Sequence, residues 1–195
     1  VWKKIKKVNK NNFELIDTIT NIQNLEKKIG INLSNNQKII EFSPLTYKYL
    51  NIISKKINSF HGGLLIIDYG YLEKKMKNSL QSVYKHKFNQ ILENFARSDI
   101  TYNISFHLLK KITKKLNLKV AGLATQKDFL TKLGIVQRAE IISKNLQFSK
   151  KADIYYRLKR LIDNKFMGEL FKVMFITKKN NKFKLGFKNW LFQKN

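Results

Sequence analysis

Hydrophobic positions along the chain alternate between short runs typical of strands and longer periodic stretches typical of helices. The clearest strand covers residues 64–67, where four consecutive apolar residues predict a parallel strand buried on both faces. The helix before it is expected to begin at Ser43 and Pro44, because serine is a good N-cap and proline suits the first helical position. Apolar residues then recur on one face of that helix as far as Phe60.

The rest of the chain continues this alternation. Further strands are expected at residues 12–16, 38–42, 118–124 and 170–177, and helices at residues 72–83, 106–116, 126–146 and 152–162. No repeat and no linker rich in Gly, Ser or Pro interrupts the order. The pattern therefore predicts an α/β fold, with a single domain over residues 1–177 and a polar and aromatic tail over residues 178–195.

The formal net charge of +26 over 195 residues suggests a nucleic-acid interface, but the composition favours another explanation. Only four of the 39 basic residues are Arg, the side chain that most often reads phosphates and base edges, and lysine pairs are spread along the whole chain. Lys, Asn and Ile share AT-rich codons and are the dominant residues. An AT-rich genome therefore explains the charge best, and no specific nucleic-acid partner is expected.

Several kinds of site are missing from the sequence. The eight glycines include no G-x-G spacing, which a dinucleotide-type loop needs so that the backbone can approach its ligand. There is no cysteine, and the three histidines lack the spacing of metal ligands, so no metal site is expected. No apolar run is long enough to span a membrane. The residues alone show no complete active site.

Three residues remain as candidates for chemistry. Asp68 directly follows the strand at residues 64–67, where open α/β sheets bind ligands, although a simple turn explains it equally well. His86 is a candidate general base because the pKa of a histidine lies near neutrality, and an exposed histidine without a role is the alternative. Glu41 precedes the cap at Ser43, and its role stays open.

Six stretches together resemble one family. They are EFSP at 41–44, GGLLIIDYG at 62–70, LQSVYKHKF at 80–88, SDIT at 98–101, TQKDFLTKLGIVQRAE at 125–140 and MGELFKV at 167–173. Their order and spacing are similar to the second half of the MidA-like family of class I S-adenosylmethionine-dependent methyltransferases. The mitochondrial members of that family are complex I assembly factors that dimethylate a protein arginine.

The resemblance implies a fold and a cofactor. Residues 64–67, 118–124 and 170–177 would be the fifth, sixth and antiparallel seventh strands of a Rossmann-like sheet, with extra helices between the last two strands. The chain would be the C-terminal half of that domain. The glycine-rich loop of the family would lie upstream of Val1, so S-adenosylmethionine would be bound mainly by the missing N-terminal half.

The resemblance also implies a function. As a full-length enzyme the protein would methylate a protein arginine, with a respiratory complex I subunit as the expected partner. Asp68 and Asp99 would hold the guanidinium, and His86 is the third candidate catalytic residue. The family often has His and Asp where this chain has Asn103 and Ser105, so roles of those two side chains are not carried over.

Two alternatives and a location complete the expectations. The chain is alternatively a non-catalytic, lysine-rich binding module for nucleic acid, or an inactive gene fragment. If the source is bacterial, the expected location is the cytoplasm, and in a eukaryote it is the mitochondrion. A first residue other than Met favours a piece of a longer protein.

Overall fold

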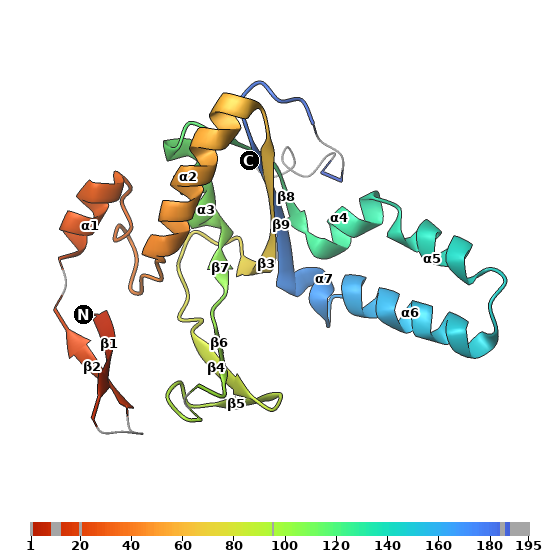
Figure 1. Ribbon diagram of the computed structural model, residues 1–195, viewed down its shortest axis with the longest axis horizontal. Coiled ribbons are helices and arrows are strands. Elements are labelled where there is room, and N and C mark those ends of the chain that lie inside the picture. The colour runs from red at the N-terminus through yellow and green to blue at the C-terminus, as the bar shows by residue number, and fades with distance from the viewer. Residues whose placement is uncertain (1, 9–12, 20, 95, 184–185, 188–195) are drawn as a thin grey trace. The chain divides into compact units, whose positions relative to one another are not determined.

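The computed structural model describes residues 2–8, 13–19, 21–94, 96–183 and 186–187 (Figure 1). The chain divides into two compact units. The hairpin unit consists of residues 1–41 and 75–103, and the sheet unit consists of residues 42–74 and 104–195. The chain passes from one unit to the other at three places.

The sheet unit is built on strands in the order β7-β3-β9-β8. Their bounds are Gly63–Tyr71 (β3), Ile104–Ser105 (β7), Lys119–Thr125 (β8) and Phe171–Thr177 (β9). β9 runs antiparallel to both β3 and β8, whereas β7 runs parallel to β3. This mixed sheet with its helices confirms the predicted α/β class and the expected antiparallel last strand.

Helices cover both faces of this sheet, to different extents. They are Pro44–Phe60 (α2), Phe106–Lys115 (α3), Gln126–Lys132 (α4), Ile135–Ser143 (α5), Phe148–Ile162 (α6) and Met167–Leu170 (α7). α3 covers the face that carries Gly70, since a Cβ at Gly70 would overlap the ring of the fully buried Phe106. α4 covers the opposite face, where Phe129 forms a core cluster with Ala124 and Val173.

The predicted starts of α2 and α3 are confirmed. The Ser43 hydroxyl accepts the Thr46 N–H (3.2 Å), and Pro44 occupies the first turn of α2. The Ser105 hydroxyl accepts the Leu108 N–H (3.2 Å) at the start of α3. Each cap satisfies one of the N–H groups that a helix leaves without an internal partner.

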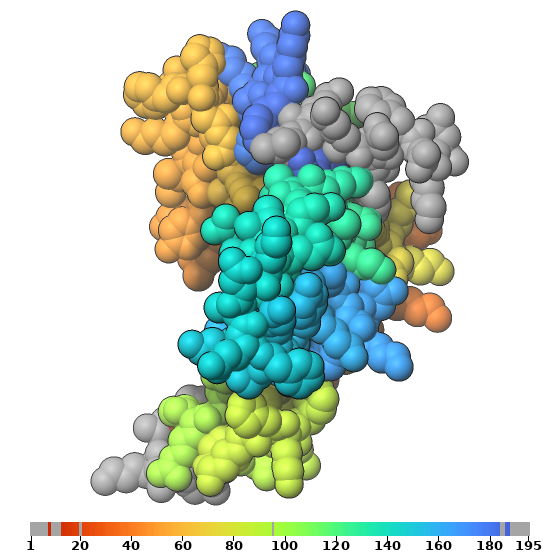
Figure 2. All heavy atoms as spheres, turned by 90° about the vertical axis from the view of Figure 1, so that its right-hand side faces the viewer, coloured from red at the N-terminus to blue at the C-terminus, as the bar shows by residue number. Residues whose placement is uncertain are grey.

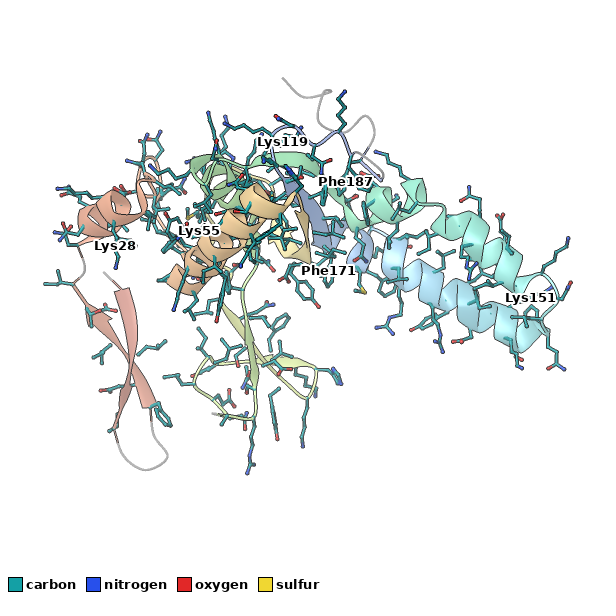
Figure 3. All side chains as sticks on the ribbon, turned by 45° about the horizontal axis from the view of Figure 1, so that its top comes forward. Lys28, Lys55, Lys119, Lys151, Phe171 and Phe187 are labelled. Carbon is teal, nitrogen blue, oxygen red and sulfur yellow. The ribbon has the colours of Figure 1, made fainter. Side chains whose placement is uncertain are left out.

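β3 is longer than predicted, and the expectation that it is buried on both faces is wrong. Its burial alternates, and one face leaves Leu65, Ile67 and Tyr69 exposed to 45%, 46% and 40%. Tyr69 contacts Phe171 of β9, with ring centroids 4.1 Å apart (Figure 3). Since β7 pairs only with Gly70 and Tyr71, the described residues provide the rest of β3 with ladder partners on the β9 side alone.

The hairpin unit contains two small antiparallel sheets and a helix. The first sheet pairs Trp2–Lys7 (β1) with Phe13–Thr18 (β2), and Ile22–Ile29 (α1) follows it. The second has the order β5-β4-β6, with bounds Gln81–Tyr84 (β4), Lys87–Asn89 (β5) and Asp99–Thr101 (β6). Residues 72–83, where the sequence analysis expected a helix, contain no helix, and β4 begins at Gln81.

Two other predicted elements need correction. Residues 38–42 are not a strand. The side chains of Gln37, just before this segment, and Glu41, within it, accept the backbone N–H groups of Met76 and Ser79. The helix expected over residues 126–146 is two helices, α4 and α5, separated at Gly134, whose φ of 82° leaves the right-handed helical region.

The start of the expected tail joins the core. Phe187 is 95% buried (5% exposed), and its ring centroid lies 4.8 Å from that of Phe129. A Cβ at Gly122 would overlap the Phe187 ring, so this glycine of β8 makes room for the aromatic side chain. Trp190, Leu191 and Phe192 of the same expected tail lie outside the described residues.

Candidate functional site

Asp68 lies within β3, three residues before its end, and not in a turn after a strand. The turn interpretation of this residue is therefore wrong. The half-buried side chain lies on the sheet face that also carries Gly70, and Lys172 of β9 is its cross-strand neighbour. The Tyr69 backbone N–H donates to Asp68 Oδ1 (2.8 Å). The carboxylate thus lies near the carboxyl end of a central strand, which is where a ligand-binding group is useful in an α/β sheet.

Asp99 and His86 belong to the hairpin unit and share its three-stranded sheet. Asp99 begins β6 and is in register with Val83 of β4. His86 lies in the turn between β4 and β5, with a positive φ of 64°. Both side chains are exposed, and both lie toward the end of the sheet where this turn is. The structure therefore places these two candidates on one small sheet, whereas Asp68 belongs to the other unit.

The sequence did not indicate a role for Glu41. In the structure its carboxylate accepts hydrogen bonds from a distant segment of the chain. Glu41 Oε1 accepts the backbone N–H groups of Ser79 (2.8 Å) and Leu80 (3.2 Å), and Oε2 accepts the Ser79 hydroxyl (2.6 Å). The Asn103 N–H in turn donates to Ser79 Oγ (2.9 Å). We call this set of bonds between Glu41, Ser79 and Asn103 the carboxylate clamp.

The clamp ties together three segments that are far apart in the sequence. Each segment lies within a few residues of a place where the chain passes between its two units. Asn103 stands where the family often has His. It contributes to the clamp through its backbone N–H and not through its side chain, so this difference is compatible with the clamp. Sequence inspection could not find this role, because the partners of Glu41 lie 38 or more residues away.

Replacing Glu41 with Gln is expected to loosen the clamp. The neutral amide loses the charge-assisted bonds, and its NH₂ group cannot accept the Ser79 hydroxyl proton. The cost is about 1–2 kcal/mol, which corresponds to amide hydrogen exchange roughly 5- to 30-fold faster at Ser79 and Leu80. Glu140→Gln, an exposed substitution on α5, serves as the control. Unchanged exchange at these two amides in the Glu41 variant would argue against the clamp.

Among the described residues, Glu26 and His107 have a shifted pKa. Hydrogen bonds lower the pKa of Glu26. The largest cause is the Ser34 backbone N–H, followed by the Ser34 side chain and then the Leu33 backbone N–H. Glu26 Oε1 accepts both N–H groups at 2.6 Å. These bonds therefore stabilise the fold above the unfolded pKa of the carboxyl, and this contribution is lost as the pH falls through the lowered value. They are structural, since they close the loop that follows α1.

The second shifted group is His107 in α3. Burial lowers the pKa of His107, and the nearby charges of Lys111, Lys74 and Lys110 lower it further. The ring therefore resists protonation more than an ordinary histidine does. Among the described residues, no group of three His, Asp or Glu side chains is arranged to hold a metal ion.

A hollow lined by His61, Gly62 and Lys178 lies at the opposite end of β3 from Asp68. Lys178 Nζ donates to the Asn58 carbonyl of α2 (3.0 Å) and lies 3.5 Å from His61 Nδ1. A lysine that satisfies a carbonyl in the last turn of a helix completes the helix end. We therefore assign this hollow to helix capping and not to ligand binding.

The residues present do not form a cradle for a nucleotide-type cofactor. Within the described ranges, the glycines with positive φ are Gly30, Gly134 and Gly186, of which the first two flank helix ends. Gly70, near the end of β3, is packed against Phe106 and the Ile104 carbonyl. No described glycine turn therefore follows a parallel strand, as such a cradle requires.

The lysines are as dispersed in the structure as in the sequence. Figure 3 labels four of them, Lys28, Lys55, Lys119 and Lys151, which extend from α1, α2, β8 and α6. In the described part of the chain, no helix is both long and apolar enough to cross a membrane.

Comparisons with known proteins agree with the fold. A family described as "Putative S-adenosyl-L-methionine-dependent methyltransferase" matches residues 2–124. The mitochondrial protein arginine methyltransferase NDUFAF7 of Xenopus tropicalis is 25% identical over 134 residues, which is 68% of this chain and 31% of that protein. The Caenorhabditis elegans homologue is 32% identical over 98 residues, or 50% of this chain and 23% of that protein.

Two crystal structures from Burkholderia thailandensis have a similar fold. One COG1565 superfamily protein superposes with a TM-score of 0.77 at 17% identity, covering 96% of this chain and 51% of its own. A second, described as a likely methyl transferase bound to S-adenosyl-homocysteine, has a TM-score of 0.70 at 16% identity, covering 90% of this chain and 46% of its own.

This chain thus spans about half the length of the solved structures and less than a third of the curated relatives. The family match extends over more than half of its residues. The chain therefore belongs to the MidA-like, or COG1565, family of S-adenosylmethionine-dependent methyltransferases.

Proposed function

We propose that this chain supplies the C-terminal part of a methyltransferase domain that transfers a methyl group from S-adenosylmethionine to a protein arginine. The observation that carries the proposal is the sheet order β3-β9-β8 with β9 antiparallel, which is the order of the fifth, seventh and sixth strands in a class I methyltransferase. The arginine substrate is supported by the names of the curated relatives.

In this proposal the cofactor is bound mainly by a part of the domain that this chain does not contain. S-adenosylmethionine would supply the electrophilic methyl group. Since the described residues form no cradle for it, the contribution of this chain is to position the substrate, which is the main demand of an in-line displacement.

We assign substrate binding to three carboxylate or imidazole side chains. A guanidinium needs planar acceptors, and Asp68 within β3 and Asp99 on β6 are the candidates. His86, in the β4–β5 turn, is the candidate proton acceptor. The partner would be a protein substrate related to respiratory complex I, and the location mitochondrial in a eukaryote or cytoplasmic in a bacterium, by analogy with the mitochondrial relatives.

The test is methyl transfer by a joined protein in which the first half of the family domain precedes residues 1–195. With methyl-labelled cofactor, a peptide containing one arginine should be labelled, and the same peptide with lysine should not. Asp68→Asn should lower kcat by about 100-fold while cofactor affinity stays within about 2-fold. Labelling of the lysine peptide instead would contradict the arginine assignment.

A further inference from the structure

A second carboxylate lies near Asp68 at the edge of the sheet where β3 ends. β9 is antiparallel to β3, so the start of β9 lies beside the end of β3, and Phe171 is in register with Tyr69. Glu169 of α7 comes two residues before β9 begins. It therefore lies at the same end of β3 as Asp68, and its side chain is 47% exposed, which leaves the carboxylate accessible.

Lys172 of β9 is a neighbour of both carboxylates. It is paired in register with Asp68, and residues paired in this way lie side by side on one face of a sheet, with Cβ atoms about 5 Å apart. The Lys172 ammonium donates to the Glu169 carbonyl and lies 3.9 Å from Glu169 Oε2. The Lys172 side chain is only 11% exposed. Since a lysine is seldom this well buried without an acidic partner, Glu169 is one partner that accommodates it.

The helices between β8 and β9 fix the backbone of Glu169. α5 and α6 pack side by side as a helical arm, residues 135–162, which leaves the sheet in Figure 1 and is seen from its end in Figure 2. α7 returns the chain from this arm to β9 and packs against α4 and α6. A Cβ at Gly168 would overlap the Ile162 carbonyl, and the Gly168 N–H donates to the Asp163 carbonyl (3.1 Å). α7 is thus held closely against the end of α6, and Glu169 follows Gly168 directly.

A guanidinium needs more acceptors than Asp68 alone offers. It presents five N–H donors in one plane, and a bidentate carboxylate accepts two of them. Asp68 Oδ1 already accepts the Tyr69 N–H (2.8 Å), which reduces its capacity further. A second carboxylate at the same edge supplies the missing acceptors. The ammonium of Lys172 offsets the repulsion between the two carboxylates when no substrate is bound.

We propose that Glu169 is a further substrate-binding carboxylate, which contacts the guanidinium together with Asp68, and that Lys172 holds Glu169 in place. All three residues belong to the sheet unit. Lys172 acts through Glu169 and is therefore a positioning residue. The inference rests on the proposed function, because it names further residues for the same arginine substrate.

The first test is the labelling of the arginine peptide by the joined protein. Glu169→Gln should raise KM at least about tenfold while kcat stays within about threefold, because the lost contact binds the ground state and the transition state alike. Glu140→Gln on α5 makes the same chemical change on an exposed helix and should leave both constants within about twofold. Affinity for S-adenosylhomocysteine, measured by calorimetry, should stay within about twofold in every variant, which shows that the variants are folded.

A second test asks whether Glu169 recognises the charge of the substrate. Anisotropy compares the fluorescent arginine peptide with the same peptide containing citrulline, a neutral analogue, on joined protein saturated with S-adenosylhomocysteine. The unaltered protein should prefer the arginine peptide, and Glu169→Gln should lower this preference about tenfold, whereas Glu140→Gln should leave it unchanged. A purely structural role of Glu169 would weaken both peptides equally and would contradict the proposal.

The role of Lys172 is tested by a double-mutant cycle. Lys172→Met should raise KM at least about fivefold in the unaltered protein, because Glu169 loses the ammonium that holds it, but should change KM by less than about twofold in the Glu169→Gln background. Lys172→Arg keeps the charge and should stay within about twofold. Additive effects of the two substitutions would overturn the positioning role.

Failure of the inference is distinguishable from failure of the proposed function. If the unaltered joined protein labels no arginine peptide, the proposed function is wrong and this inference with it. If the peptide is labelled, and Asp68→Asn lowers kcat while Glu169→Gln leaves KM within about twofold, the inference alone is wrong.

Discussion

The isolated chain should lose solubility as the salt concentration rises from about 10 to 300 mM. β3 has ladder partners from β9 along its length but from β7 only at its last two residues, and its outer face exposes Leu65, Ile67 and Tyr69. An open, apolar strand edge pairs readily with other chains. Repulsion by the net charge of +26 opposes this at low salt, and screening removes that protection.

Light scattering over a salt titration measures this effect, and two variants identify its origin. Ile67→Lys places a charge on the outer face of β3 and should keep the chain soluble at the highest salt concentration. Ile141→Lys adds the same charge on the arm and should protect far less. Adding the first half of the family domain should rescue the original chain. A soluble monomer that melts cooperatively at about 300 mM salt without any partner would show that β3 needs no further strand.

The parts of the fold that could be predicted from sequence have a strong local signal. The caps at Ser43 and Ser105 and the apolar row of α2 fix two helix starts, and continuous apolar runs mark β3, β8 and β9. No element was predicted at β1 or α1, which have six and eight residues, and other missed parts are short and polar. β4, β5 and β6 have three or four residues each, which is too short for an alternation of hydrophobic and polar positions to be distinguished from a loop.

The burial of β3 shows a different kind of error. Its sequence is apolar on both faces, as a central strand requires, but on one face the described residues leave Leu65, Ile67 and Tyr69 exposed. The apolar sequence suits a strand that is buried on both faces. The described residues bury only one of them. The difference between the two is the physical reason to expect a further part of the domain against Leu65, Ile67 and Tyr69.

The candidate site was predictable by residue type but not by arrangement. Asp68 was found because it follows an apolar run, although the strand continues past it to Tyr71. Asp99 came from the family resemblance and His86 from the chemistry of histidine, and their common sheet could not be inferred, since 12 residues and a separate strand lie between them. Glu41 had no local signal for its clamp, because its partners are distant in sequence.

The chain alone should not bind the methyl donor or its product. A cofactor of this kind needs backbone N–H groups presented by a glycine turn after a parallel strand. Among the described glycines, Gly30 and Gly134 lie at helix ends, and Gly70 and Gly122 make room for aromatic rings. The joined protein would contain the missing turn, so its affinity should be higher by at least about a hundredfold.

The central claim is that the cofactor is bound by a part of the domain that this chain does not contain. Calorimetric titration with S-adenosylhomocysteine tests it most directly, because the binding of the chain alone and of the joined protein can be compared. Both proteins are titrated at low salt, where the chain alone is expected to stay soluble. The account predicts no saturable heat for residues 1–195 alone and a saturable one-to-one isotherm for the joined protein. A saturable one-to-one isotherm for the chain alone, with a Kd in the range of about 1–10 μM, would show that the chain holds a complete cofactor site and would contradict the account.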